Sequence, residues 1–147
     1  ELLKETLESF QALIKMKNVT IKVKLPKGDK VEMIIDKEKI KLALQNLIEN
    51  AVNYSLPQSL VTISVKYDKM NLIFMIEDNG IGIPKNQQAR IFTKFFRGDN
   101  AVKMETEGTG LGLYLTKNII EKHGGKIWFE TEENKRSTFY FTLPLAK

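Results

Sequence analysis

The sequence predicts a two-layer α/β sandwich, in which helices cover one face of a mixed, mostly antiparallel sheet. Segments that alternate apolar and polar residues predict strands, and longer segments with apolar residues every three or four positions predict helices. Their order along the chain, with strands before, between and after the helices, is typical of a sheet covered on one face. The predicted strands are residues 19–25, 31–35, 61–67, 71–77, 126–130 and 137–143, and the predicted helices are residues 36–54, 84–91 and 110–122.

Turn-forming and capping residues separate these elements. The Pro-Lys-Gly-Asp run at 26–29 predicts a turn that joins the first two strands as a hairpin. Asp36 is a typical N-cap for the helix that follows, and Pro84 suits the first turn of the short helix. The His-Gly-Gly run at 123–125 predicts the end of the last helix.

Composition excludes several classes of function. The chain has 147 residues, which fits one ordinary domain, and no apolar run approaches the roughly 20 residues that cross a bilayer. It has no cysteine and one histidine, His123, which excludes thiolate and histidine-rich metal sites. The net charge of +5 favours an anionic partner, but the basic residues are nearly all lysine and form no block with aromatic residues. Neither nucleic acid nor a membrane surface is therefore expected as a partner.

The first 17 residues form a separate segment. Leu3, Leu7, Phe10 and Ile14 are spaced by four and three residues, as in two heptads of a coiled coil. Because this pattern already runs at residue 1, we expect the end of a helical dimerisation segment or linker, followed by one domain over residues 18–147. The alternative is an amphipathic helix that packs on its own domain.

The helix at 36–54 carries an unusual polar face. Asn46, Asn50 and Asn53 stand at positions i, i+4 and i+7, with Glu49 beside them. Asparagine is a poor helix former, so three on one face suggest a function. Amide oxygens are suitable ligands for magnesium. A plain solvated face is the alternative.

Two glycine motifs suggest contact with a ligand. Asp78-Asn79-Gly80-Ile81-Gly82-Ile83 directly follows a strand, where a carboxylate can accept from an exocyclic amine and glycine lets the backbone approach a flat ligand. An ordinary glycine turn is the alternative reading. The run at 108–113, GTGLGL, precedes a helix and can offer backbone N–H groups to an anion.

The segment between the two motifs completes the pattern. Residues 92–97 read FTKFFR, whose phenylalanines can also be core residues, and Lys94 and Arg97 can supply positive charge. The polar run at 98–107 suggests a loop that closes over phosphates. The Walker sequence and the motifs of eukaryotic-type kinases are absent.

In this order, the asparagine-rich helix, the D-x-G-x-G motif, the phenylalanine-rich stretch and G-T-G-L-G-L resemble the catalytic domain of bacterial sensor histidine kinases. The resemblance covers about residues 19–145. It implies a Bergerat-type ATP-binding fold with a mobile lid, and Mg²⁺ and ATP as cofactors. It further implies that the γ-phosphate passes to a histidine on an upstream helical domain in two-component signalling.

The resemblance also implies roles for individual residues. Asn50 would ligate magnesium, Asp78 would accept from the adenine amine, and Thr138 would support the adenine site through water. Asn46, Glu49 and Asn50 would be the catalytic group. The residues implied in nucleotide binding are Asn46, Asn50, Asn53, Tyr54, Asp78, Gly80, Gly82, Ile83, Lys94, Phe95, Arg97, Gly108, Thr109, Gly110, Leu111, Gly112, Leu113 and Thr138.

Three positions qualify the resemblance. In the wider superfamily, which also includes gyrase and the Hsp90 chaperones, members that hydrolyse ATP have a glutamate base where this chain has Asn46, and an amide cannot take a proton from water. Asn53 stands where many relatives carry a basic residue, so one phosphate contact is missing. Two alternatives follow: Lys94 or Arg97 replaces this contact, or the domain binds ATP weakly. Arg136 occupies a position where members of the family commonly have a glycine. We expect Arg136 to be a charged residue on the surface.

The resemblance implies partners as well as an activity. They are ATP, the upstream dimerisation and phosphoacceptor domain, and a response regulator receiver domain reached through the parent kinase. His123 lies at a predicted helix end, which favours capping over a role as the phosphoacceptor. A cytoplasmic location is implied, within a parent sensor of the cell membrane. The alternatives are a degenerate nucleotide-binding or protein-interaction module and a serine kinase of the anti-sigma-factor type.

Overall fold

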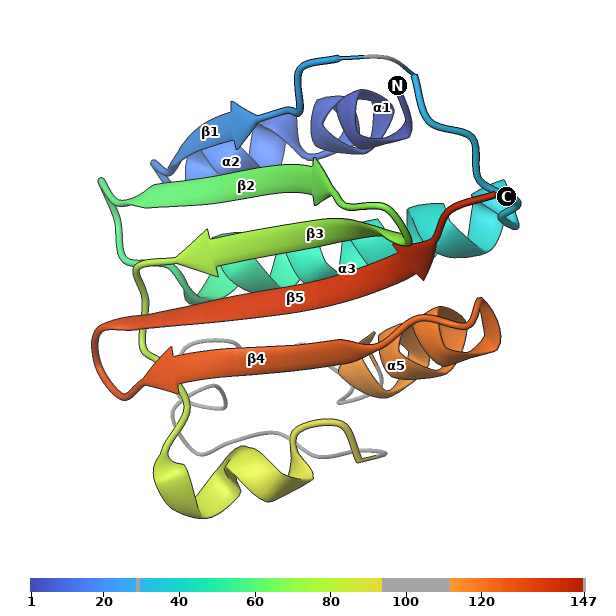
Figure 1. The fold of residues 1–147 in the computed structure, drawn as a ribbon. Coiled ribbons are helices and arrows are strands. Elements are labelled where there is room, and N and C mark those ends of the chain that lie inside the picture. The colour runs from blue at the N-terminus through green and yellow to red at the C-terminus, as the bar shows by residue number, and fades with distance from the viewer. Residues whose placement is uncertain (29, 94–111, 147) are drawn as a thin grey trace.

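The computed structural model describes residues 1–28, 30–93 and 112–146. It shows a five-stranded sheet with helices on one face, as predicted (Figure 1). The helices are α1 (Leu2–Ser9), α2 (Gln11–Met16), α3 (Lys37–Tyr54), the 3₁₀ helix η1 (Lys85–Arg90) and α5 (Gly112–Lys122). The strands are β1 (Thr20–Lys24), β2 (Leu60–Tyr67), β3 (Asn71–Asp78), β4 (Ile127–Glu132) and β5 (Arg136–Pro144).

The strand order in the sheet is β1-β2-β3-β5-β4. The pairs β2–β3, β3–β5 and β5–β4 are antiparallel, and only β1 and β2 are parallel. In the register of the two central strands, Ile76 is opposite Phe139 and Phe74 is opposite Phe141. The rings of Phe74 and Phe141 stack at 4.7 Å, which contributes to the core between sheet and helices.

The long helix α3 covers the middle of the sheet. Asp36 caps it as predicted, because its side chain accepts a hydrogen bond from the Lys39 backbone N–H at 3.2 Å. The apolar stripe predicted from the sequence is buried against the strands: Ile40, Leu44, Leu47, Ile48 and Ala51. Burying this stripe turns the asparagine face toward α5 and away from the sheet.

The predicted hairpin between residues 19–25 and 31–35 is wrong. The first of these segments forms β1, but residues 31–35 form no strand. Instead, β1 pairs in parallel with β2, with α3 as the crossover that parallel strands require. Met33 and Ile35 pack against the core, whereas Ile34 is 91% exposed. The alternation of buried and exposed residues at 31–35 therefore comes from a loop that packs on the core.

The N-terminal segment packs on its own domain. It consists of two short helices, α1 and α2, separated at Phe10. The first of these helices contacts α3, and its residue Thr6 is fully buried. The four apolar residues of the heptad pattern are partly buried against the domain core. This agrees with the alternative stated above, an amphipathic helical segment that packs on its own domain. The assignment of residues 1–17 to the end of a longer dimerisation segment stays a prediction.

The remaining elements follow the sequence closely. The helix predicted at 84–91 is a 3₁₀ helix over Lys85–Arg90, and Pro84 is its N-cap residue. In the part of the chain that the structure describes, no helix has the length and apolar character that a membrane crossing requires.

Candidate functional site

The asparagine face of α3 meets the start of α5. The Asn46 side-chain amide donates a hydrogen bond of 3.3 Å to the Gly112 carbonyl, which also accepts from the Thr116 hydroxyl at 2.7 Å. Asn50 and Asn53, on the same face, are half-buried. Glu49 is exposed. The structure therefore brings the asparagine helix against the end of the second glycine motif.

Asp78 is the last residue of β3 and is only 5% exposed. Loss of hydration raises the pKa of its carboxyl from 3.8 to about 7, and the charge of the adjacent Glu77 adds to this rise. Backbone hydrogen bonds from Gly80 and Ser137 act in the opposite direction. None of the groups that shift this pKa is a cation. A buried carboxylate in such surroundings is well suited to accept a hydrogen bond from a ligand.

The loop after Asp78 runs across the C-terminal end of α3. Ser55 and Gly80 form an isolated β-bridge, and the Ile81 backbone N–H donates to the Tyr54 carbonyl at 3.3 Å. A Cβ on Gly80 would lie 2.0 Å from that carbonyl oxygen, so only glycine fits. The contact brings Asp78 close to the last turns of the asparagine helix.

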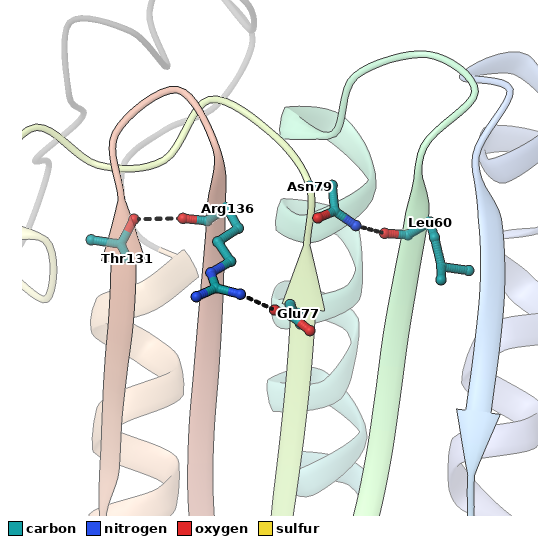
Figure 2. A network of polar contacts seen from close by, with 5 residues as sticks. All are labelled: Leu60, Glu77, Asn79, Thr131 and Arg136. Atoms are coloured by element: carbon teal, nitrogen blue, oxygen red, sulfur yellow. Dashed lines mark hydrogen bonds and ion pairs between the residues drawn. The ribbon is translucent and has the colours of Figure 1, made fainter.

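The same loop is fixed on two other sides. The Asn79 side chain donates to the Leu60 carbonyl at 2.7 Å, at the start of β2 (Figure 2). On the opposite side, the Asn134 backbone N–H donates to the Ile81 carbonyl at 2.7 Å, and the Ile83 backbone N–H donates to the Thr131 hydroxyl at 3.0 Å. The loop is thus held by β2, α3 and the β4–β5 turn.

Gly82 has a packing role in this arrangement. Its φ of +66° is in the left-handed region, and a Cβ would lie 2.3 Å from the Glu132 carbonyl oxygen. Glycine here lets the loop approach the β4–β5 turn. A contact of Gly82 with the base of a nucleotide stays a prediction.

Thr138, which the resemblance places at the adenine site, does not lie on the same face of the sheet as Asp78. In the β3–β5 register, Thr138 is opposite Glu77, and Ser137 is opposite Asp78. Opposite residues share a face, so Thr138 lies on the uncovered face with Glu77 and Glu130, which line a shallow pocket there. Ser137 is the hydroxyl on the same face as Asp78, and its period-two spacing with Phe139 and Phe141 could have identified it from the sequence.

The phenylalanine-rich stretch is described only at its start. Phe92 packs edge-on against Phe129 at 5.9 Å and Phe139 at 6.3 Å, so it is a core residue. Leu113 in α5 also packs against the core. The predicted site residues Lys94, Phe95, Arg97, Gly108, Thr109, Gly110 and Leu111, with the predicted lid, lie outside the described residues.

His123 connects the ends of two helices. Its Nδ1 lies 2.8 Å from the Ile119 carbonyl oxygen, and its Nε2 accepts from the Asp36 backbone N–H at 3.0 Å. A ring that accepts at Nε2 donates at Nδ1, so both nitrogens are engaged. This geometry supports the helix-end interpretation over a phosphoacceptor role.

Known proteins similar to this chain are sensor kinases. It is 36% identical over 148 residues to the adaptive-response sensory kinase SasA of Synechocystis sp., an alignment that covers 100% of the chain and 38% of SasA. It is 41% identical over 112 residues to the sensor histidine kinase WalK of Bacillus subtilis, covering 75% of the chain and 18% of WalK. The chain therefore spans well under half the length of these relatives.

Solved structures agree with this similarity. The catalytic domain of the histidine kinase ThkA matches with a TM-score of 0.82 and 30% identity, covering 97% of this chain and 91% of that domain. ThkA in complex with the response regulator TrrA matches with a TM-score of 0.79 and 27% identity, covering 99% of this chain and 40% of ThkA. The family model described as "Histidine kinase-, DNA gyrase B-, and HSP90-like ATPase" matches residues 35–147. The chain belongs to this family, and its fold is that of a histidine kinase catalytic domain.

Proposed function

We propose that this chain binds Mg²⁺ and ATP and transfers the γ-phosphate to a histidine on an upstream helical domain. The observation that carries the proposal is the placement of Asp78. Its buried carboxylate lies at the end of β3, beside the C-terminal turns of the asparagine helix. That arrangement supports a base at Asp78 and phosphates along Asn46, Asn50 and the start of α5.

The adenine base would be held by Asp78. Its carboxylate accepts a hydrogen bond from the exocyclic amine, and burial strengthens this bond because water does not compete. With a pKa of about 7, the carboxyl of the free protein is partly protonated at neutral pH. A donor from the base favours the ionised form, so adenine binding releases protons near neutral pH. Tyr54, Ile83 and Gly82 would flank the base.

The residues present fit a magnesium ion that is held mainly by the nucleotide. Across the described ranges, no group of three or more His, Asp and Glu side chains is placed to bind a metal. Mg²⁺ accepts one protein oxygen together with phosphate oxygens and water, and the half-buried Asn50 amide can supply that oxygen. When bound, the ion neutralises the negative charge that develops on the transferred phosphate.

The protein's own part in the reaction is to position the reactants. The bond between the γ-phosphorus and the oxygen bridging to the β-phosphate breaks, a bond forms to a nitrogen of the acceptor imidazole, and ADP leaves. Asn46 has no proton-accepting group, which supports transfer over hydrolysis. Glu49, which is exposed, would take the proton of the incoming imidazole.

Charge and partners complete the proposal. Lys94 and Arg97 would contact the phosphates in place of the cation missing at Asn53, together with Phe95 and the backbone of Gly108, Thr109, Gly110 and Leu111. A receiver domain of a response regulator would take the phosphate from the histidine, in line with the solved complex of ThkA and TrrA. The parent would be a membrane sensor with this domain in the cytoplasm.

Calorimetric titration with ATP, with and without Mg²⁺, tests the site. We expect binding by the wild type that magnesium strengthens, and no binding by Asp78→Asn, because its amide oxygen is a weaker, uncharged acceptor and its NH₂ group puts a donor where the carboxylate has an acceptor. A folded wild type that binds no ATP would contradict the proposal. After a helical phosphoacceptor domain is joined upstream, we expect acid-labile phosphohistidine; acid-stable phosphoserine would indicate a serine kinase instead.

A further inference from the structure

Thr131, near the end of β4, joins three segments around the loop after Asp78. Its hydroxyl accepts from the Ile83 backbone N–H at 3.0 Å and donates to the Arg136 carbonyl at 3.0 Å, the second contact being visible in Figure 2. Its Oγ1 also lies 2.8 Å from Oγ of Ser137, the residue opposite Asp78 in the β3–β5 register. This side chain in β4 therefore connects the loop after Asp78 with the first two residues of β5, the strand beside the buried carboxylate.

The hydrogens of these two hydroxyls can be assigned by counting. A threonine hydroxyl has one hydrogen and two lone pairs. The hydrogen of Thr131 goes to the Arg136 carbonyl, which can only accept. The bond between the two hydroxyls therefore uses the hydrogen of Ser137, and Ile83 uses the second lone pair of Thr131. Ser137 keeps only lone pairs for any other partner.

We propose that Thr131 is a positioning residue that sets the hydrogen-bond polarity of the base site, by holding the hydrogen of Ser137 away from Asp78. The inference rests on the proposed ATP site. Ser137 and Asp78 lie on the same helix-covered face, so their two side chains offer only acceptors when the carboxyl is ionised. A purine with an amine at C6 presents donor hydrogens to these acceptors. A purine with a carbonyl at C6 presents a third acceptor and leaves polar groups unpaired, which is strongly unfavourable when buried.

Three variants separate this role from a purely structural one. Thr131→Val keeps the shape of the side chain but removes the hydroxyl, so the hydrogen of Ser137 can turn toward the Asp78 carboxylate. Thr131→Ser keeps the hydroxyl and is the matched control. The double variant Thr131→Val with Ser137→Ala removes the freed donor as well. All three keep the backbone contacts of the β4–β5 turn.

The first experiment compares the affinities for ATP and GTP, each with Mg²⁺, by calorimetry at about pH 8.5, where Asp78 is ionised. We expect Thr131→Val to reduce the preference for ATP about tenfold, and Thr131→Ser to change it less than about twofold. Adding Ser137→Ala should restore most of the preference. A parallel loss of both nucleotides with an unchanged ratio would overturn the proposal, because a merely structural role produces that result.

The second experiment needs no nucleotide. A carbon NMR titration of the Asp78 carboxyl in the full chain should show that Thr131→Val lowers its pKa by about one unit, because a new hydrogen bond favours the ionised form. Thr131→Ser should leave the titration unchanged. An unchanged titration in the valine variant would overturn the assignment of the hydrogen. A wild type that binds neither nucleotide would overturn the proposed function instead, and this titration would still decide where the hydrogen of Ser137 lies.

Discussion

The side-chain amide of Asn46 in α3 donates its hydrogen bond to the carbonyl oxygen of Gly112, 66 residues later, at the first residue of α5. The same oxygen accepts from the hydroxyl of Thr116, which is fully buried. Two motifs that are far apart in the sequence therefore meet at one atom. We therefore expect a movement of α5 to displace the asparagine face of α3, and a movement of α3 to displace the start of α5.

We expect Asn46→Ala to destabilise the domain by about 1 kcal/mol, the usual contribution of one such hydrogen bond. The start of α5 should lose amide protection most, because the Gly112 carbonyl loses one of its two side-chain donors. Thermal unfolding and hydrogen exchange over residues 112–116 measure the two effects. Gln45→Ala removes the neighbouring amide from the same helix and is the control. Equal exchange in both variants would show that the bond does not couple α3 to α5.

Asp78 should make the free domain less stable as pH rises. Its pKa in the folded state, about 7, is above the ordinary value of 3.8 for an aspartate, so between these values the folded state binds more protons than the unfolded state. The free energy of unfolding therefore falls with increasing pH by up to about 1.4 kcal/mol per unit, and levels off above pH 7. Asp78→Asn should remove this decrease and stabilise the domain at neutral pH, although it abolishes ATP binding.

Urea unfolding at a series of pH values tests this opposition between stability and binding. Asp68→Asn is a control of opposite sign, because hydrogen bonds from the backbone of Met70 and Asn71 lower the pKa of Asp68. If Asp78→Asn is less stable than the wild type above neutral pH, the prediction is wrong. The ionised carboxylate would then be stabilised by an interaction that outweighs the cost of burying it.

Gly80→Ala should disrupt the loop after β3. The new Cβ would meet the Tyr54 carbonyl oxygen at 2.0 Å. The backbone fixes the position of this Cβ and the oxygen is itself a backbone atom, so neither can turn aside. We expect a loss of about 1–3 kcal/mol in stability, together with weaker ATP binding as Asp78 moves away from α3. Gly112→Ala is the matched control for stability, because its Cβ would have only ordinary contacts, 3.7 Å from the Asn46 side chain. Similar losses in the two variants would contradict this steric explanation.

Much of the fold could be predicted because its signals are local. The cap at Asp36, the buried stripe of α3 and the alternation of β5 each depend on neighbouring residues, and each is observed. The pairing of β1 was missed because alternation at 31–35 also suits a loop lying on the core. Only the crossover through α3 decides between a hairpin and a parallel pair.

The candidate site shows the same division. Asp78 and the asparagine face could be predicted because each belongs to a short, local sequence motif. The choice between Ser137 and Thr138 depends on the register of β3 with β5, which no single segment contains. Thr131 was missed for a similar reason, because its partners lie in two other segments of the chain, Ile83 in the loop after β3 and Arg136 and Ser137 in β5.

His123→Ala should separate the helix-end role from a phosphoacceptor role. The ring joins the C-terminal end of α5 to the N-terminus of α3, so its loss should lower the free energy of unfolding by about 1–2 kcal/mol, for two hydrogen bonds at a partly exposed position. When a helical phosphoacceptor domain is joined upstream, phosphohistidine should still form in this variant at a temperature where it is folded. Asp36→Asn keeps the cap and the backbone N–H, so it should retain both stability and phosphorylation. Loss of all phosphohistidine in a folded His123→Ala protein would identify His123 as the acceptor and contradict the proposed transfer to an upstream histidine.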